Sequence, residues 1–232
     1  MKKNLDQLEK KLEIKWRHPQ LLAQALVHRS FLNEVGGAGL ESNERLEFLG
    51  DAVLSFTVSN WLYTQFPDYR EGELTNLRSN LVRTSTLAQI SQELDLGEKL
   101  LMSRGEVASG GRENPSLLAN TLEAVIGAIF LDQGIDQTTL FIKTHLTPFL
   151  EKIVSLGEFK DSKSLLQEKI QEKNKETPLY KTLEETGPDH DKTFTVGVYA
   201  QNQLLAQAQG KNKQEAEEKA AKNALEKSGL KS

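Results

Sequence analysis

The sequence predicts an α+β fold in two parts, an all-α region over residues 1–155 and an α-β-β-β-α unit over residues 160–231. Three observations support this prediction. Apolar residues of the first region recur at three- and four-residue spacing, which is the period of an amphipathic helix. Short strand-like runs bounded by turn residues follow, between residues 178 and 210. The stretch 151–161 holds a glycine among charged residues and indicates a boundary or short linker.

Two helices of the first region have clear start signals. One helix is predicted to follow Ser42 or Asn43, since both residue types are favourable N-caps, and to continue to about residue 63. The other begins at Asn114, the cap, with Pro115 at the first helical position. It continues to about residue 133 and is apolar almost all round, which is typical of a buried helix.

The second unit is expected to open and close with helices. The first covers about 164–173, and the last begins at about residue 211 and is closed by Gly229. Turn residues separate three strand-like runs between these helices, at 178–187, 192–200 and 203–210.

Composition excludes several classes of function. The chain has 232 residues, no Cys and a net charge of −4, so thiolate catalysis and Cys-ligated metal sites are excluded. Its longest apolar run, Ala124–Leu131, is far shorter than the roughly 18 residues of a membrane span. The charged N-terminus lacks the apolar stretch of a secretory signal, so we expect a cytoplasmic protein without a membrane partner. No Gly-Lys-Ser/Thr phosphate loop occurs, so we expect no nucleotide cofactor.

Three acidic residues share one face of the first long helix. Glu44, Glu47 and Asp51 stand at i, i+3 and i+7, within roughly 60° of one another around the axis. A solvated acidic face is the simpler interpretation, and we favour it for Glu44 taken alone. Asp51 fits it poorly, because Gly50 and Asp51 are both unfavourable inside a helix. Residues that lower local stability often serve a function.

The apolar second helix carries Asn120 and Glu123 three residues apart, on one face. A carboxylate in such a helix is costly unless it is paired or bound to a metal. Pairing of Glu123 with Arg or Lys is one interpretation. Several carboxylates without obvious cations instead suit a divalent metal such as Mg²⁺. Glu71, beside Gly72, is a further candidate that alone would be a cap or a surface acid.

The segment NERLEFLGDAVL resembles the signature of the ribonuclease III family, endonucleases that cut double-stranded RNA. Other segments resemble further blocks of the family in the right order, and the last 70 residues resemble its double-stranded-RNA-binding domain. The matching blocks are ALVHRSFLNE (25–34), NERLEFLGDAVL (43–54), REGEL (70–74), RGEVASGG (104–111) and LLANTLEAVIGAIFLDQG (117–134). The resemblance implies an endonuclease domain over 1–155 and an RNA-binding domain over 160–231.

The resemblance also assigns roles to the acids. Glu47, Asp51 and Glu123 match the metal-binding and catalytic carboxylates, which implies Mg²⁺, with Mn²⁺ as a substitute. Glu44 and Glu71 match supporting acids of the same cleft. Asn120 falls at a metal-binding, catalytic position where the family usually carries Asp. Its amide oxygen can still bind a metal, but the site loses one negative charge.

Phe48 matches a residue that packs across the family's dimer interface, which implies a homodimer. An ordinary core position is an equally good interpretation of Phe48 from sequence alone.

The resemblance implies RNA contacts at three places in the second unit: its first helix, the loop between its first two strands, and the start of its last helix. The matching residues are Gln167, Glu168, Pro188, His190, Lys211 and Lys213. Gln214 and Glu215 stand where the family often has Lys or Arg. A solvated helix start remains an alternative for the two lysines.

The implied reaction is hydrolysis of both strands of double-stranded RNA, leaving 5′-phosphate and 3′-hydroxyl ends with short 3′ overhangs, in the processing of rRNA precursors and mRNA. Two alternatives remain open. One is a double-stranded-RNA-binding protein of the same fold whose cleavage is impaired by Asn120. The other is a structural role in a ribonucleoprotein particle, which retention of the acidic residues argues against.

Overall fold

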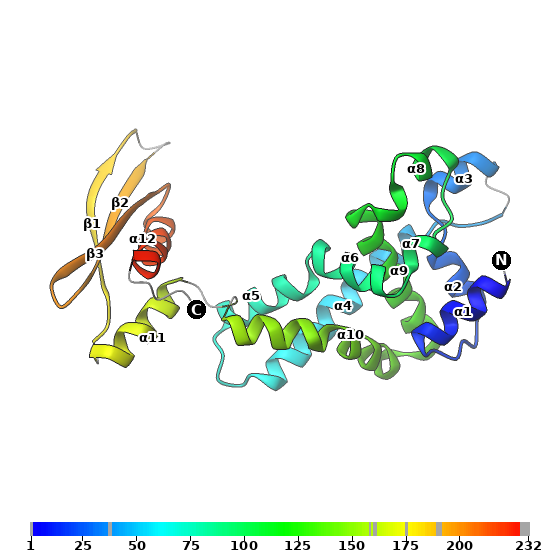
Figure 1. Ribbon diagram of the computed structural model, residues 1–232, viewed down its shortest axis with the longest axis horizontal. Coiled ribbons are helices and arrows are strands. Elements are labelled where there is room, and N and C mark those ends of the chain that lie inside the picture. The colour runs from blue at the N-terminus through cyan, green and yellow to red at the C-terminus, as the bar shows by residue number, and fades with distance from the viewer. Residues whose placement is uncertain are drawn as a thin grey trace. The chain divides into compact units, whose positions relative to one another are not determined.

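A computed structural model describes residues 2–36, 39–157, 159, 162–174, 176–188 and 192–227. The chain divides into two compact units, Met1–Ser155 and Leu156–Ser232 (Figure 1). The division between the units falls within the stretch 151–161 that the sequence indicated as a boundary or short linker. Helix α10 continues to Leu156, because apolar residues such as Ile153 keep a helical face buried up to this boundary.

The described part of the first unit is helical, with one short 3-10 turn. Its elements are α1 (Lys2–Leu12), α2 (Pro19–Ala25), α3 (Arg29–Val35), α4 (Glu44–Gln65), α5 (Glu71–Val82), α6 (Thr84–Glu93), α7 (Leu96–Lys99), α8 (Arg104–Ala108), η1 (Gly111–Glu113), α9 (Pro115–Gln133) and α10 (Ile135–Leu156).

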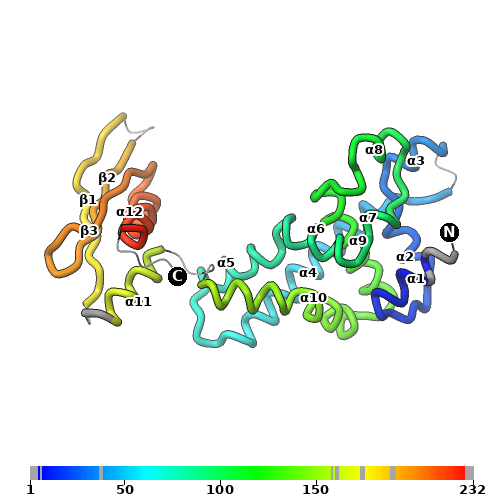
Figure 2. Tube along the Cα trace, viewed as in Figure 1, coloured from blue at the N-terminus to red at the C-terminus, as the bar shows by residue number. Residues whose placement is uncertain are grey.

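Helix α9 is the centre of this unit. It packs against α2, α4, α6 and α7, and the tube view shows it among them (Figure 2). Its Asn114 cap is as predicted, since Asn114 Oδ1 accepts from the backbone N–H of Ser116 at 2.9 Å. By length and composition α9 resembles a membrane span, with a mean hydropathy of 1.3, but 61% of that window is buried inside the unit. It is therefore packed as a core helix.

Helix α4 crosses α9 at two glycines. A Cβ on Gly50 would stand 1.8 Å from the carbonyl oxygen of Glu123, and one on Gly127 would stand 2.3 Å from that of Leu46. Only glycine fits at either position without moving a backbone. The two helices can therefore approach closely at the turns that carry the acidic residues.

The start of α4 differs in detail from the prediction. Asn43 occupies the N-cap position, but its side chain makes no cap hydrogen bond. Its Nδ2 instead donates to the carbonyl oxygen of Ala25 at 3.3 Å, and the residue is buried. Asn43 thus ties the start of α4 to the end of α2.

The second unit has the predicted α-β-β-β-α order: α11 (Ser162–Asn174), β1 (Leu179–Thr186), β2 (Thr193–Ala200), β3 (Gln203–Gly210) and α12 (Lys213–Lys227). The strands form an antiparallel sheet in the order β1-β2-β3. Gln201 and Asn202 form the β2–β3 turn with φ of 51° and 61°, which suits a tight hairpin. Gly229 lies outside the described residues.

The core of this unit lies between the helices and one face of the sheet (Figure 1). Val198 of β2 and Ala206 of β3 face a strip of alanines on α12, and Leu166 and Ile170 of α11 complete the cluster. The strip itself consists of four buried residues, Ala216, Ala220, Ala221 and Ala224. Small side chains let α12 lie close to the sheet.

Candidate active site

A cleft of about 640 Å³ opens where α4, α9 and the start of α3 meet. Most of the acidic and amide residues singled out from the sequence line it. They are Glu44, Glu47 and Asp51 of α4, and Asn120 and Glu123 of α9, together with Phe48. Because α4 and α9 cross closely at Gly50, the acidic residues of α4 lie beside Asn120 and Glu123 of α9.

The carboxylates of the cleft act on one another. Burial raises the pKa of Glu123 to about 7, and the charges of Asp51 and Glu47 add to this effect. The pKa of Glu47 is also raised, by burial and by Glu44 and Asp51, while Arg29 acts in the opposite direction. Within the described residues Glu123 forms no ion pair with Lys or Arg, so the pairing interpretation is wrong.

Converging acids of this kind suit a divalent cation, because a bound cation removes the repulsion and provides the missing charge partner. The donor set is chemically right for Mg²⁺: carboxylate oxygens, plus the amide oxygen of Asn120. The described part of the chain contains no three His, Cys, Asp or Glu residues already grouped closely enough to hold a metal ion. The carboxylate and amide oxygens therefore line one cleft, but they do not already form a complete set of metal ligands.

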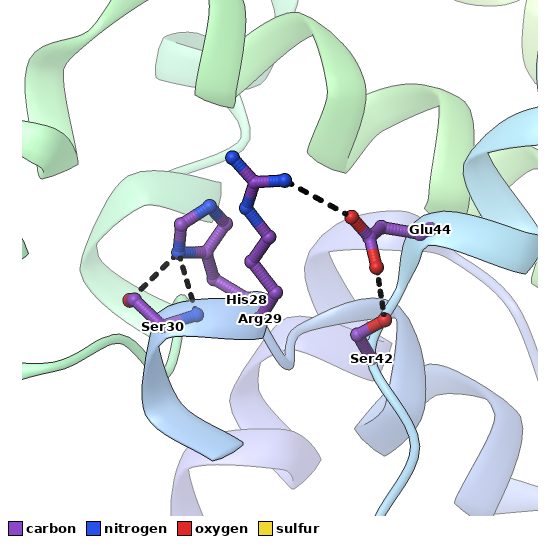
Figure 3. Close-up of polar contacts among 5 residues, drawn as sticks. All are labelled: His28, Arg29, Ser30, Ser42 and Glu44. Carbon is purple, nitrogen blue, oxygen red and sulfur yellow. Dashed lines mark hydrogen bonds and ion pairs between the residues drawn. The ribbon is translucent and has the colours of Figure 1, made fainter. Parts of the chain in front are cut away.

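Glu44 lies at the rim of this cleft and is held from two sides (Figure 3). Ser42 Oγ donates to Glu44 Oε2 at 2.9 Å, and Arg29 Nη1 lies 3.6 Å from Glu44 Oε1. Arg29 and His28 also line the cleft. From the sequence, His28 is interpreted as a structural histidine and Arg29 has no predicted role, although both stand in the block ALVHRSFLNE that resembles the family.

Phe48 is not a core residue. The residue is 80% exposed and stands at the edge of the cleft. Phe56 and Tyr63 of the same helix are exposed as well, and several exposed aromatic residues together often mark a surface that another molecule covers.

Glu71 does not line this cleft within one chain. Glu71 begins α5, after the far end of α4, a helix of 22 residues and therefore about 33 Å long. It lines a separate cleft of about 670 Å³ with Phe56, Tyr63 and Arg78, among others. Thr75 Oγ1 donates to Glu71 Oε1 at 3.0 Å.

Comparisons with known proteins identify the family. Residues 18–150 match the family described as Ribonuclease-III-like, and residues 162–228 match the double-stranded RNA binding motif. Ribonuclease 3 of Desulforamulus reducens is 45% identical over 221 residues, covering 95% of this chain and 90% of that protein. The chain belongs to the ribonuclease III family. Its members are double-stranded-RNA-specific endoribonucleases, and this chain carries both of the family's domains.

Two further relatives support this assignment to the ribonuclease III family. Ribonuclease 3 of Pelotomaculum thermopropionicum is 45% identical over 223 residues, covering 96% of this chain and 92% of that protein. The crystal structure of the nuclease domain of ribonuclease III from Campylobacter jejuni matches with a TM-score of 0.55 and 42% identity. It covers 65% of this chain and 95% of that domain. The resemblance stated from the sequence is therefore confirmed.

The predicted RNA-contact residues of the second domain fall partly within the described residues. Gln167 and the exposed Glu168 lie on α11, and Lys211 is exposed just before α12. Pro188 is exposed, and His190 lies outside the described residues.

Lys213, the first residue of α12, has partners within its own domain. Its Nζ lies 2.8 Å from Glu185 Oε1 of β1 and 5.5 Å from the centre of the Phe194 ring. Glu215 stands at a position where the family often has Lys or Arg, and it helps to cap α12. Its Oε2 accepts from the backbone N–H of Lys211 at 2.8 Å, and its own N–H donates to Asn212 Oδ1 at 2.8 Å.

Proposed function

We propose that the cleft between α4 and α9 hydrolyses both strands of double-stranded RNA with Mg²⁺, or with Mn²⁺ as a substitute. The observation that carries this proposal is the convergence of Glu47, Asp51 and Glu123 on one cleft, with the pKa of Glu123 raised to about 7. The pKa is raised first by burial and then by the charges of Asp51 and Glu47. A bound cation stabilises buried, like-charged carboxylates, and carboxylate oxygens are the ligands that Mg²⁺ prefers.

Each cleft residue has a distinct task in this proposal. Glu47, Asp51 and Glu123 hold the metal as carboxylates, so Glu123 must lose its proton before the site is complete. Asn120 contributes its amide oxygen without charge. When bound, the metal activates water and neutralises charge on the phosphate under attack. Glu44, fixed by Ser42 and Arg29, stays at the rim, where it supports the site.

We propose a homodimer as the working unit. Phe48 is exposed at the cleft edge, and Phe56 and Tyr63 are exposed further along the same helix. A solved relative is described as showing flexibility in a region involved in dimer formation of the nuclease domain of ribonuclease III from Campylobacter jejuni. Since Glu71 lies outside the cleft of its own chain, it supports a cleft only from a second copy.

We propose that five residues of the second domain bind the RNA duplex: Gln167, Glu168, His190, Lys211 and Lys213. Double-stranded RNA is bound by shape across two minor grooves and the phosphates between them. The products proposed are ends with 5′-phosphate, 3′-hydroxyl and short 3′ overhangs, and the substrates are rRNA precursors and mRNA in the cytoplasm.

Asn120 favours one alternative, a protein that binds double-stranded RNA without cutting it. The test is incubation of a long end-labelled RNA duplex with the full chain in Mg²⁺, in Mn²⁺ and in chelator, with single-stranded RNA as the control. Metal-dependent conversion of the duplex into short duplexes with 5′-phosphate ends supports the nuclease. Binding without cutting in either metal supports the alternative.

A further inference from the structure

His28 and Arg29, at the start of α3, line the cleft together with the carboxylates, and they are called the wall below. Arg29 is the one Lys or Arg among the ten residues that line the cleft. Its charge acts on Glu47. Burial raises the pKa of Glu47, and the positive charge of Arg29 acts in the opposite direction. A cleft that takes an RNA strand needs hydrogen-bond donors for phosphate oxygens as well as ligands for a metal.

Most of the Arg29 donors remain open to a further acceptor. The side chain is 71% exposed, and its one ion pair to a described residue, with Glu44, is 3.6 Å long. A guanidinium has five N–H donors in a planar fork that matches a phosphate group. An exposed pair of this length contributes little stability, so exchange of Glu44 for a phosphate costs little.

The hydrogen bonds around His28 fix its tautomer. Its Nδ1 accepts from the backbone N–H of Ser30 at 3.3 Å, which caps α3, and lies 2.8 Å from Ser30 Oγ. Ser30 Oγ accepts from the N–H of Ser103 at 3.0 Å and so has its own proton to donate to Nδ1. The ring hydrogen therefore sits on Nε2, which Figure 3 shows on the side of the ring away from Ser30, toward Arg29.

We propose that His28 and Arg29 form a phosphate-binding wall, which holds a backbone phosphate of the RNA strand beside the carboxylates of the cleft. Arg29 provides the charged fork and His28 provides an Nε2–H donor. This proposal rests on the proposed function, since it takes the cleft to be the place where the RNA strand lies. It gives the cleft two substrate-binding residues in addition to the acids.

Three single substitutions in the full chain test the wall. Arg29→Gln removes the charge and the fork. His28→Asn keeps an oxygen that caps α3 through the N–H of Ser30 and removes the Nε2–H donor. Arg45→Gln is the matched control, because Arg45 is 86% exposed, pairs with Glu41 at 3.8 Å and does not line the cleft.

Cleavage of duplex RNA is measured as kcat/KM over a range of KCl concentrations. Arg29→Gln is expected to lower kcat/KM roughly 10- to 100-fold, the loss of a charge-assisted hydrogen bond, and His28→Asn by several-fold. Binding of an intact duplex is measured in the Glu123→Gln background. There Arg29→Gln is expected to lower the slope of log Kd against log salt by about 1, and Arg45→Gln to leave it unchanged.

The wall is contradicted if Arg29→Gln matches Arg45→Gln in both assays, or if cleavage falls while the salt slope of binding stays the same. The second result would mean that Arg29 only positions Glu44. Failure of the proposed function looks different: the unsubstituted chain would cut no duplex in either metal. A flatter salt slope for Arg29→Gln would then still support the wall as part of an RNA-binding site.

Discussion

Gly50 of α4 lies against the carbonyl group of Glu123 of α9, so closely that a Cβ on residue 50 would stand 1.8 Å from that oxygen. Gly127 makes the reciprocal approach to the carbonyl of Leu46. This double contact sets the distance between the two central helices of the first unit. It also decides that Glu123 faces the same cleft as Glu47 and Asp51.

Replacement of Gly50 by Ala should therefore lower the free energy of unfolding and distort the cleft between α4 and α9. The added methyl group forces the helices apart, and overpacking of this kind lowers the free energy of unfolding by about 1–3 kcal/mol or more. Gly72→Ala is the control, because a Cβ at Gly72 of α5 meets no atom within 4 Å and alanine favours a helix. Urea unfolding of both variants checks the difference. Equal stability of the two variants would show that α4 and α9 do not meet as described.

The raised pKa of Glu123 predicts how the metal-free protein responds to pH. The folded state holds a proton on Glu123 up to about pH 7, whereas the ordinary pKa is 4.5, so the folded state binds more protons between these values. Stability is then lost as pH rises from about 4.5 to 7. Glu123→Gln removes this dependence, so the variant should gain stability over the unsubstituted protein as pH rises.

Unfolding in chelator at pH 5, 6, 7 and 8 measures this difference between Glu123→Gln and the unsubstituted protein. Addition of Mg²⁺ at pH 8 should restore stability to the unsubstituted protein more than to the variant, because metal binding requires the carboxylate. A difference between the two proteins that does not change with pH would contradict the assigned shift.

Asn120→Asp adds a fifth carboxylate to the cleft, beside Glu44, Glu47, Asp51 and Glu123. More ligand charge strengthens binding of Mg²⁺, so the Mg²⁺ concentration for half-maximal cleavage should fall several-fold. In chelator the variant should be less stable than the unsubstituted protein, since another like charge is added. Asn60→Asp, on the exposed side of α4, is the control. An unchanged Mg²⁺ requirement would show that residue 120 is not a ligand.

Phe48→Ala should weaken the proposed homodimer without unfolding the monomer. The ring is 80% exposed in a single chain, so its removal leaves no cavity. Sedimentation velocity over a range of protein concentrations should show a larger dissociation constant for Phe48→Ala. Leu131→Ala, at another exposed apolar position, is the control. If both variants associate like the unsubstituted chain, Phe48 is not an interface residue.

When Lys213 binds a phosphate, it must either give up its ion pair with Glu185 or contact Glu185 and the phosphate at the same time. Glu185→Gln removes this competitor, so duplex binding should tighten, whereas Lys213→Ala should weaken it and lower the salt slope by about 1. Filter binding with the full chain measures both. If Lys213→Ala leaves the salt slope unchanged, Lys213 is only a solvated residue at the start of α12.

The sequence predicted the order of the elements because periodicity and turn residues are local signals. It also identified Gly50 as a residue that lowers helix stability for another purpose, but the purpose is a helix crossing, which no local pattern reveals. Glu71 lies outside the cleft of its own chain, and a motif match does not show which copy of the chain a residue serves. The wall formed by His28 and Arg29 was not predicted, because His28 was interpreted as structural and the place of α3 beside the cleft is not a local signal.

The most direct test of the account compares Glu123→Gln with Glu113→Gln, a control residue outside the cleft, in the full chain. The same preparations are assayed for duplex cleavage in Mg²⁺ and for duplex binding. We predict that Glu123→Gln binds the duplex as tightly as Glu113→Gln but cuts it at least 100-fold more slowly, a loss on the order of that seen for removal of a group that stabilises the transition state. Normal cutting by Glu123→Gln would contradict the assignment of this cleft as the metal-dependent active site.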